Sequence, residues 1–216
     1  ADPEPVAIAK LLAPRATRSQ PQRAIVAADY DALARRESPG LQAASAVLRW
    51  TGSWYEVLVS ADERGRADPD PSVLGALAGR LERFRRMGHD VVVAPARSVP
   101  LTITLSVCVA AHHRRSDVAA ALGDVFSSRA PGGMFHPDRL VPGGPIASSV
   151  ITAAAQSIDG VESVEVTGLR RLFGPSTVPV PVDGVLRFGP TEVARVDSNP
   201  LDPDLGSIGF VMRGGR

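Results

Sequence analysis

The clearest feature of the chain is a strict alternation of apolar and polar residues over positions 101–109. The apolar members, which share one face, are Leu101, Ile103, Leu105, Val107 and Val109, and the residues between them are Thr102, Thr104, Ser106 and Cys108. A period of two is typical of a β-strand with one buried face. We therefore predict that residues 101–109 form a core strand whose five apolar side chains are buried.

A helix and a short strand precede this core strand. Asp70 followed by Pro71 is a typical helix start, because aspartate caps a helix well and proline fits its first turn. Apolar residues then recur at helical spacing, at Leu74, Leu77, Leu81 and Phe84. The helix is expected to end at Gly88, and the run Asp90–Val93 predicts a short buried strand. A proline-bounded link, Ala94–Pro100, leads from there into the core strand.

Two apolar runs further upstream predict a β-hairpin. The runs Leu41–Trp50 and Trp54–Ser60 flank a short turn of three residues, Thr51-Gly52-Ser53. The tryptophans Trp50 and Trp54 lie on either side of this turn. They either stack across it or form an exposed anchor for a partner.

A helix over Ala28–Ala34 is predicted before the hairpin. The side chains that face inward in a helical projection are Tyr30, Leu33 and Ala34. Together with the hairpin, the next helix and the short strand, it gives a small α+β unit over residues 24–94. The basic residues of the connection before this unit are Arg15, Arg18 and Arg23. That connection, which follows a short predicted helix, is either a solvated linker or an arm that docks on a neighbouring subunit.

The second half of the chain contains further helix, loop and strand patterns. A helix capped by Ser116-Asp117 is predicted, and its inward side chains are Val118, Leu122, Val125 and Phe126. Residues 127–145 are interpreted as an ordered or semi-ordered loop, because this Gly- and Pro-rich run follows a helix and lacks the lysine of a phosphate-binding loop. An apolar helix face is then predicted from Ile146, Val150, Ile151, Ala154 and Ile158. Strands are predicted over 161–166, 185–188, 192–196 and 206–211.

These patterns predict the α+β class, with two small α+β units in tandem and a β-rich C-terminal segment. The predicted divisions are 1–23 for an N-terminal helix and linker arm, 24–97 for the first unit, 98–172 for the second unit, and 173–216 for the β-rich segment. The first unit is expected to contain the hairpin, a helix and a strand, and the second unit a long strand, two helices and a strand.

Composition narrows the functional classes. Hydrophobic residues make up 44% of the 216 residues and aromatic residues only 5%, so the core is expected to consist mainly of Val, Leu, Ile and Ala. The formal net charge is +1, from 24 basic and 23 acidic residues, which argues against binding nucleic acid through many phosphate contacts. No apolar run is long enough to span a membrane, and the start shows no signal-peptide pattern. The first residue is not Met, so a fragment of a longer protein is one expectation.

Few residues are candidates for chemistry. Those considered for a hydrolase are Asp29, Asp117, His112, His113 and His136. No motif sets a nucleophile beside a base, and adjacent histidines at a strand end are expected to point to opposite sides, away from a shared metal ion. The single cysteine, Cys108, excludes an intramolecular disulfide and a multi-cysteine zinc site. We predict no catalytic residue, no cofactor and no metal site.

Five short motifs occur in an order and spacing that resemble a known family. They are RAIVAADYDALAR at 23–35, the junction of a strand, Val-Pro-Leu and a long strand at 90–109, PGGMF at 131–135, IDGVESV at 158–164, and LRFGPTEVA at 186–194. In this order they resemble the baseplate J-like family of contractile phage tails and related injection machines. Two positions depart from the family pattern. Ala27 replaces a threonine that caps the helix, so the cap is expected from Asp29 or water, and His136 replaces a glycine.

The resemblance implies a non-enzymatic structural subunit of a baseplate wedge, which acts by assembly with other baseplate subunits and copies of itself. It also implies assembly in the cytoplasm into a phage tail or phage-tail-like particle, without nucleic acid or a small-molecule substrate. Two other interpretations stay open. One is a regulatory module that binds a small molecule, which predicts a deep pocket with converging polar groups. The other is a hydrolase that uses the aspartate or histidine candidates named above.

Overall fold

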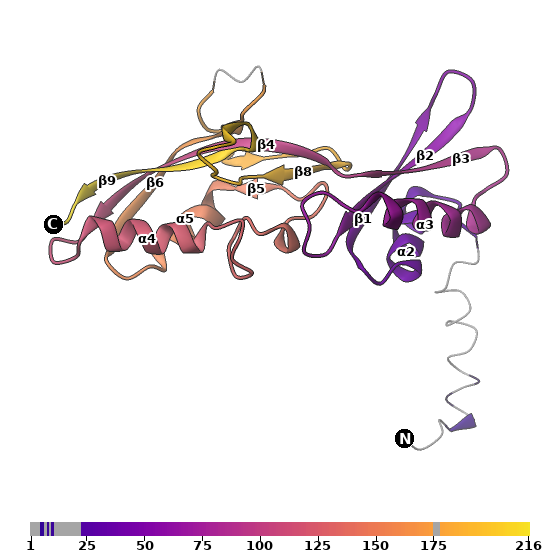
Figure 1. Ribbon diagram of the computed structural model, residues 1–216, viewed down its shortest axis with the longest axis horizontal. Coiled ribbons are helices and arrows are strands. Elements are labelled where there is room, and N and C mark those ends of the chain that lie inside the picture. The colour runs from indigo at the N-terminus through magenta and orange to yellow at the C-terminus, as the bar shows by residue number, and fades with distance from the viewer. Residues whose placement is uncertain (1–4, 7, 9, 11–22, 175–177) are drawn as a thin grey trace.

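The computed structural model describes residues 5, 6, 8, 10, 23–174 and 178–216 (Figure 1). Most of the predicted N-terminal helix lies outside the described residues, as do Arg15 and Arg18 of the connection that follows it. The described part is elongated, with two larger sheets placed end to end and helices on one side of both; a third sheet has only two short strands. This mixture of helices and largely antiparallel or mixed sheets confirms the predicted α+β class.

The first sheet has the strand order β1-β2-β3 and is covered by two helices. Its elements are α2 (Ala27–Glu37), β1 (Leu41–Trp50), β2 (Tyr55–Glu63), α3 (Pro71–Leu81), the 3-10 turn η1 (Glu82–Phe84) and β3 (His89–Pro95). β1 and β2 form the predicted antiparallel hairpin, and β3 lies parallel to β2 at the edge of the sheet. The largest buried side chains of this part are Tyr30, Leu33, Leu77 and Leu81, which pack with Val57 and Val59.

Two aspartates explain why the helices of this part begin where they do. Oδ2 of Asp29 accepts hydrogen bonds from the backbone N–H groups of Val26, at 3.0 Å, and Ile25, at 2.8 Å. These bonds cap α2 in place of the missing threonine and hold the pKa of Asp29 below its ordinary value. Oδ1 of Asp70 accepts a hydrogen bond from the backbone N–H of Ser72 at 2.8 Å, which confirms the predicted start of α3.

The second sheet is built around β4. Its strands are β4 (Arg97–Val109), β6 (Val161–Arg171), β8 (Glu192–Arg195) and β9 (Ser207–Gly214). β6 pairs antiparallel with one side of β4, while β8 and then β9 pair parallel with its other side. The remaining elements are α4 (Arg115–Val125), η2 (Pro137–Arg139), β5 (Ile146–Ala147), α5 (Ser148–Gln156), β7 (Val185–Leu186) and η3 (Pro203–Leu205). The segment predicted as β-rich, 173–216, thus supplies three strands, two of which complete this sheet.

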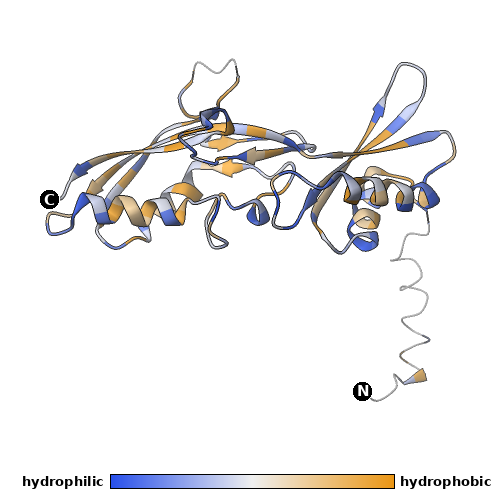
Figure 2. Cartoon of the chain, viewed as in Figure 1, coloured by the Kyte–Doolittle hydropathy of each residue, from blue (hydrophilic) through white to orange (hydrophobic). Residues whose placement is uncertain are grey.

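The burial predicted for the central strand is confirmed. Its five apolar side chains are at most 1% exposed, and these are Leu101, Ile103, Leu105, Val107 and Val109. They pack against the inward faces of α4 and α5 and against the loop between them, chiefly through Leu122, Phe126, Phe135 and Ile151. Figure 2 shows apolar residues concentrated between the sheet and these helices. The alternation in the sequence therefore marks the centre of the larger hydrophobic core.

Two helix boundaries differ from the predictions. The helix after Pro71 ends at Leu81, and a 3-10 turn and an irregular stretch follow it before Gly88, whose φ of 82° suits glycine. The helix α4 begins at Arg115 without a side-chain cap, because the hydroxyl of Ser116 donates a hydrogen bond to Asp117 within the first turn. The residue at the N-cap position is Arg114, so the predicted caps Ser116 and Asp117 lie two and three positions beyond it, inside the helix.

The predicted faces of one helix and one strand also need correction. Ile146 belongs to β5 and pairs with Leu186 of β7, a distant partner that local periodicity does not reveal. Val150 is 55% exposed, because it lies about 100° around α5 from the buried Ile151. The strand predicted as buried, β3, is an edge strand, and its Val92 is exposed.

Candidate functional site at the junction of the two sheets

The two sheets meet where β3 passes into β4. Only Ala96 separates these strands, so the predicted link Ala94–Pro100 is too long, because both strands extend into it. The N–H of Ala96 donates to the carbonyl oxygen of Ala61 in β2 at 3.2 Å. The N–H of Arg97 donates to the carbonyl oxygen of Thr191, just before β8, at 2.8 Å. The backbone therefore passes from one sheet to the other with bonds to both.

A β-bulge in β1 provides a second connection across the junction. The pairing of β1 with β2 shifts between Leu41 and Ala43, which leaves Gln42 as the extra residue. The side-chain amide of Gln42 donates hydrogen bonds to the carbonyl oxygens of Pro137, at 3.0 Å, and Leu140, at 2.8 Å. One side chain of the first sheet therefore holds both ends of the η2 turn in the second part.

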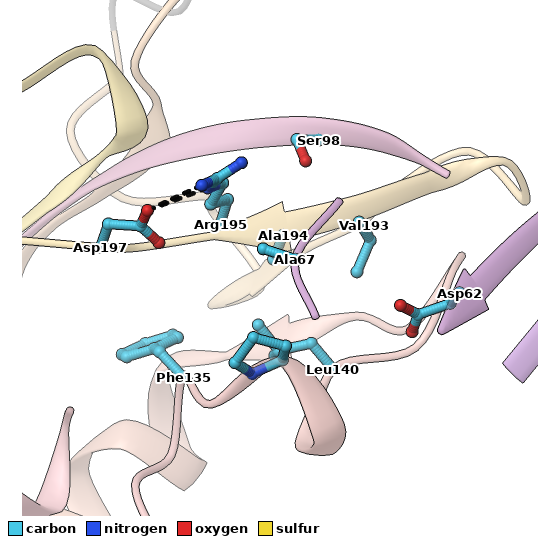
Figure 3. Close-up of a pocket in the computed structure, with 10 residues that line it drawn as sticks. Asp62, Ala67, Ser98, Phe135, Leu140, Val193, Ala194, Arg195 and Asp197 are labelled. Carbon is cyan, nitrogen blue, oxygen red and sulfur yellow. Dashed lines mark hydrogen bonds and ion pairs between the residues drawn. The ribbon is translucent and has the colours of Figure 1, made fainter. Parts of the chain in front are cut away.

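A small cavity lies between these elements (Figure 3). Its volume of about 30 Å³ is room for about two water molecules. The residues that line it include Asp62, Ser98, Phe135, Leu140, Arg195 and Asp197. Binding sites for drug-sized molecules measure about 300–1,000 Å³. The cavity is therefore too small for the ligand that a regulatory module would bind.

Asp62, at the end of β2, is a buried carboxyl group on the wall of this cavity. It is only 6% exposed, and its Oδ2 has no hydrogen-bond partner. Burial, with a smaller contribution from the neighbouring carboxylate of Asp138, raises the pKa of Asp62 to about 7. Asp138 is itself held in place, because its Oδ1 accepts a hydrogen bond from the N–H of Gly65. The junction thus contains a carboxyl group that changes charge near neutral pH.

Ion pairs hold β8 against the rest of the junction. Nη2 of Arg195 lies 2.9 Å from Oδ2 of Asp197, and Figure 3 shows this pair facing the cavity. Nη1 of Arg195 also lies 3.4 Å from Asp68, in the loop before α3. A second pair joins Arg171 of β6 to Glu192 of β8 at 2.7 Å, and this bond lowers the pKa of Glu192 to about 2.

The candidate catalytic residues are not brought together. Asp29 caps α2, and Asp117 accepts a hydrogen bond from Ser116 in the first turn of α4. Nδ1 of His136 accepts a hydrogen bond from the N–H of Asp138 at 3.2 Å, before η2. Each of these side chains has a local structural partner on a different element. The geometry therefore provides no pairing of a nucleophile with a base among them.

The adjacent histidines differ from their predicted arrangement. The ring centres of His112 and His113 are 4.5 Å apart, because both residues lie in the turn after β4 and not in the strand. Within the described part of the chain, no group of three or more His, Cys, Asp or Glu side chains is placed to hold a metal ion. Cys108 is half-buried on the face of β4 away from the helices, with its Sγ 3.6 Å from a carboxylate oxygen of Glu162.

Aromatic side chains gather at the free end of the β1–β2 hairpin, which projects beyond the helices in Figure 1. Trp50, Trp54 and Tyr55 are 58%, 51% and 47% exposed. Trp50 packs edge-on against Tyr55, with ring centres 5.0 Å apart, and Tyr55 lies 5.8 Å from His89. The ring that packs with Trp50 is thus Tyr55 and not Trp54. Three exposed rings at one end of a sheet are typical of a contact surface.

Larger hollows lie at the surface of the second part. One of about 560 Å³ is lined by residues of the loops 126–129 and 197–201 and by Phe210. Its serine hydroxyls are engaged locally: Oγ of Ser127 accepts hydrogen bonds from the N–H groups of Arg129 and Ala130, and Ser128 donates to the carbonyl oxygen of Asp197 at 3.4 Å. These hydroxyls therefore do not converge on a ligand.

Comparison with known proteins gives two findings. Residues 22–94 match the family model described as the Baseplate J-like central domain. The fold is similar to that of a chain in the cryo-EM structure of the anti-feeding prophage (AFP) baseplate, 6-fold symmetrised, with a TM-score of 0.52 and 18% sequence identity. That likeness covers 88% of the present chain and 40% of the AFP chain, so the present chain spans less than half the length of its structural relative. None of the curated proteins compared with the chain matches it.

A membrane-spanning helix is not found among the residues that the structure describes. The helices α2 to α5 are each at most 11 residues long. About 20 apolar residues are needed for a helix to cross a bilayer.

Proposed function

Because residues 22–94 match the Baseplate J-like central domain, we propose that the chain is a member of the baseplate J-like family and a structural subunit of the baseplate of a contractile phage tail or a phage-tail-like injection system. The observation that carries this proposal is the family match over 22–94, the residues that build the first sheet and its helices. The likeness in fold to a chain of the AFP baseplate extends over most of the remaining residues and supports the same assignment.

The subunit acts by assembly. Its partners are other baseplate subunits and further copies of itself, within a wedge of the plate, and the particle is assembled in the cytoplasm. The ionisable side chains described above support a structural role, because they cap helices, pair with one another or close the junction. The exposed rings of Trp50, Trp54 and Tyr55 provide a docking surface for a neighbour.

The two units, which are the two sheets with their helices, meet at Ala96. This arrangement suits a subunit of a baseplate that changes shape. Each unit has its own hydrophobic core, one around Val57 and Val59 and one around β4. The divisions 1–23, 24–97, 98–172 and 173–216 stay a proposal, and the pairing of β8 and β9 with β4 supports placing the last segment beside the second unit. Hydrogen bonds from Gln42 and the cavity beside Asp62 lie between the two units, so they control how firmly the units hold together.

The test is deletion of the gene in its native background, followed by electron microscopy of the particles. The proposal predicts particles without a normal baseplate, and normal baseplates after re-introduction of the intact gene. Particles that assemble normal baseplates without the gene would rule out the proposed function.

A further inference from the structure

In the part of the chain that the structure describes, the second sheet ends on both sides in a strand that has no further strand beside it. β6 and β9 each pair only with β4 among the described residues. Such edges present unpaired N–H and C=O groups to any other strand, and proteins usually cover or blunt them. Here the cover is partial. The N–H of Leu169 in β6 donates to the carbonyl oxygen of Pro179 at 2.7 Å, and the N–H of Ile208 in β9 donates to Oγ of Ser198 at 3.1 Å.

The parts of the β6 and β9 edges without such a bond lie beside the same residues of β4. Ser106 of β4 lies between Glu165 of β6 and Val211 of β9. Cys108 lies between Ser163 of β6 and Arg213 of β9. β6 is antiparallel to β4 and β9 is parallel to it, so β9 of one copy and β6 of another are antiparallel when the sheets are placed side by side. A sideways repeat of the chain therefore matches one open edge to the other.

The backbone of β9 is oriented for such a pairing. Successive N–H groups along a strand point to alternate sides. Because the N–H of Ile208 points away from β4, towards Ser198, those of Phe210 and Met212 also point away from β4. Within the described residues, no loop or side chain accepts a hydrogen bond from these two N–H groups. They are free to donate to a strand of another molecule.

The two edges also carry opposite charges. Exposed acids at the β6 edge are Asp159, Glu162 and Glu165, and exposed bases at the end of β9 are Arg213 and Arg216. None of these five side chains forms an ion pair with another described residue. Opposite charges on the two edges favour contact of unlike edges and oppose contact of like edges. The partner that satisfies both edges is a second copy of the same chain.

We propose that β9 of one copy adds to the outer edge of β6 of the next copy, so that the second sheets of successive copies join head to tail. Arg213 then lies opposite Ser163 of the next copy and diagonal to Glu165. Val211, which is 48% exposed, is covered by the added strand. The two contacting surfaces differ, so each copy can bind one neighbour on each side. Such a head-to-tail chain closes into a ring where the rotation between successive copies allows it. This pairing rests on the proposed function, in which copies of the chain contact one another, and it names the surface of that contact.

Disulfide trapping tests this register. Cys108 is first replaced by Ser, and the variants Ser163→Cys and Arg213→Cys are then made separately on that background. Residues directly opposite in antiparallel strands have Cα atoms about 4.5–5.5 Å apart, which suits a disulfide. Oxidation of the two variants mixed together is expected to give a cross-linked dimer, whereas each variant alone gives only background. A chain with both substitutions is expected to give a ladder of oligomers.

In the control, the Ser163→Cys variant is mixed with Ser53→Cys in place of Arg213→Cys. Ser53 lies in the exposed turn between β1 and β2, at the opposite end of the molecule from β9 in Figure 1. This mixture is expected to show only background cross-linking. The inference is overturned if the Ser163 and Arg213 variants, both folded and both reactive to a maleimide, cross-link no more than this control. It is also overturned if each variant cross-links with itself as fast as with the other, since that indicates a two-fold contact. Trapping accumulates even brief encounters, so a weak contact is still detected.

A charge swap provides a second, non-covalent measurement on the intact chain. Sedimentation of the wild-type chain is expected to show self-association that is lost in Arg213→Glu and restored when that variant is mixed with Glu162→Arg/Glu165→Arg. Loss without restoration contradicts the proposed pairing. The gene-deletion experiment separates the two proposals: trapping that fails while deletion still abolishes the baseplate removes this interface alone, and trapping that succeeds while deletion is harmless removes the assembly role alone.

Discussion

Replacing Asp62 by Asn is expected to stabilise the protein at neutral and alkaline pH and to leave it nearly unchanged at acid pH. The wild-type carboxyl is 6% exposed, one of its oxygens has no partner, and its pKa is about 7. In the unfolded chain the same group titrates near 3.8. Between these values the folded state holds a proton that the unfolded state has released. The free energy of unfolding therefore falls as the pH rises through this range, and above about 7 the loss is complete.

The size of this effect follows from the two pKa values. The difference between 3.8 and about 7 corresponds to about 4 kcal/mol, at about 1.36 kcal/mol for each pKa unit. This is an upper limit, because the cavity beside Asp62 has room for water that would solvate the carboxylate. We expect the Asn variant to be more stable than the wild type by about 2 to 4 kcal/mol at pH 8. Asn keeps the shape of the side chain and removes the charge that burial disfavours.

Urea unfolding of both proteins at pH 5 and pH 8 measures this difference directly. Other titrating groups, such as Asp31, whose pKa is raised chiefly by burial, are present in both proteins and cancel in the comparison. Asp90→Asn, at an exposed aspartate on β3, is the matched control and is expected to change stability by less than about 0.5 kcal/mol at either pH. A variant at position 62 that follows the same pH dependence as the wild type, or that is less stable at pH 8, would refute the reasoning.

Four further outcomes are expected. Leu105→Ala, at a fully buried position, should lower the free energy of unfolding by about 2–5 kcal/mol, and an unchanged urea midpoint would contradict the packing of β4. Glu192→Gln should cost about 2 kcal/mol at pH 7 through the lost pair with Arg171; since the pKa of Glu192 is about 2 when folded, the difference is lost as the pH falls from about 4.5 to 2, and a cost that persists at pH 2 would oppose this assignment. The double variant Trp50→Ala/Trp54→Ala should change stability by less than about 1 kcal/mol yet reduce incorporation into particles, and normal incorporation would exclude the rings as a docking surface. Treatment with EDTA should leave the melting temperature unchanged, whereas a marked drop would show that the fold needs a metal ion.

Features fixed by neighbouring residues were predictable from the sequence. The alternation over 101–109 gave the buried face of β4, because a strand with one covered side requires it. The start of α3 followed from Asp70, and Asp29 was one of two caps expected for α2; both carboxylates bond to backbone groups only a few residues away. The hairpin followed from two apolar runs around a short turn. In each case the interaction that decides the structure is local.

Features that depend on distant partners were missed. The sequence placed strands near 192–196 and 206–211, but only the folded chain shows that they lie in tandem along the same side of β4. The burial of Asp62 has no signal in the neighbouring sequence, because it involves the η2 region more than 70 positions later in the chain. Gln42, the extra residue of the bulge in β1, bonds to a carbonyl group 95 positions later in the chain. No periodic pattern in the sequence records such contacts, so the link between the units could be predicted but the contacts across it could not.

The central claim, that the chain is a structural subunit of a baseplate, is tested most directly by cryo-electron microscopy of particles purified from the native background. The account predicts density in the baseplate, repeated around the particle axis, into which the first sheet with α2 and α3 and the second sheet with α4 and α5 both fit. Complete baseplates whose density is fully explained by other subunits, with this chain undetected in the same particles by mass spectrometry, would contradict it.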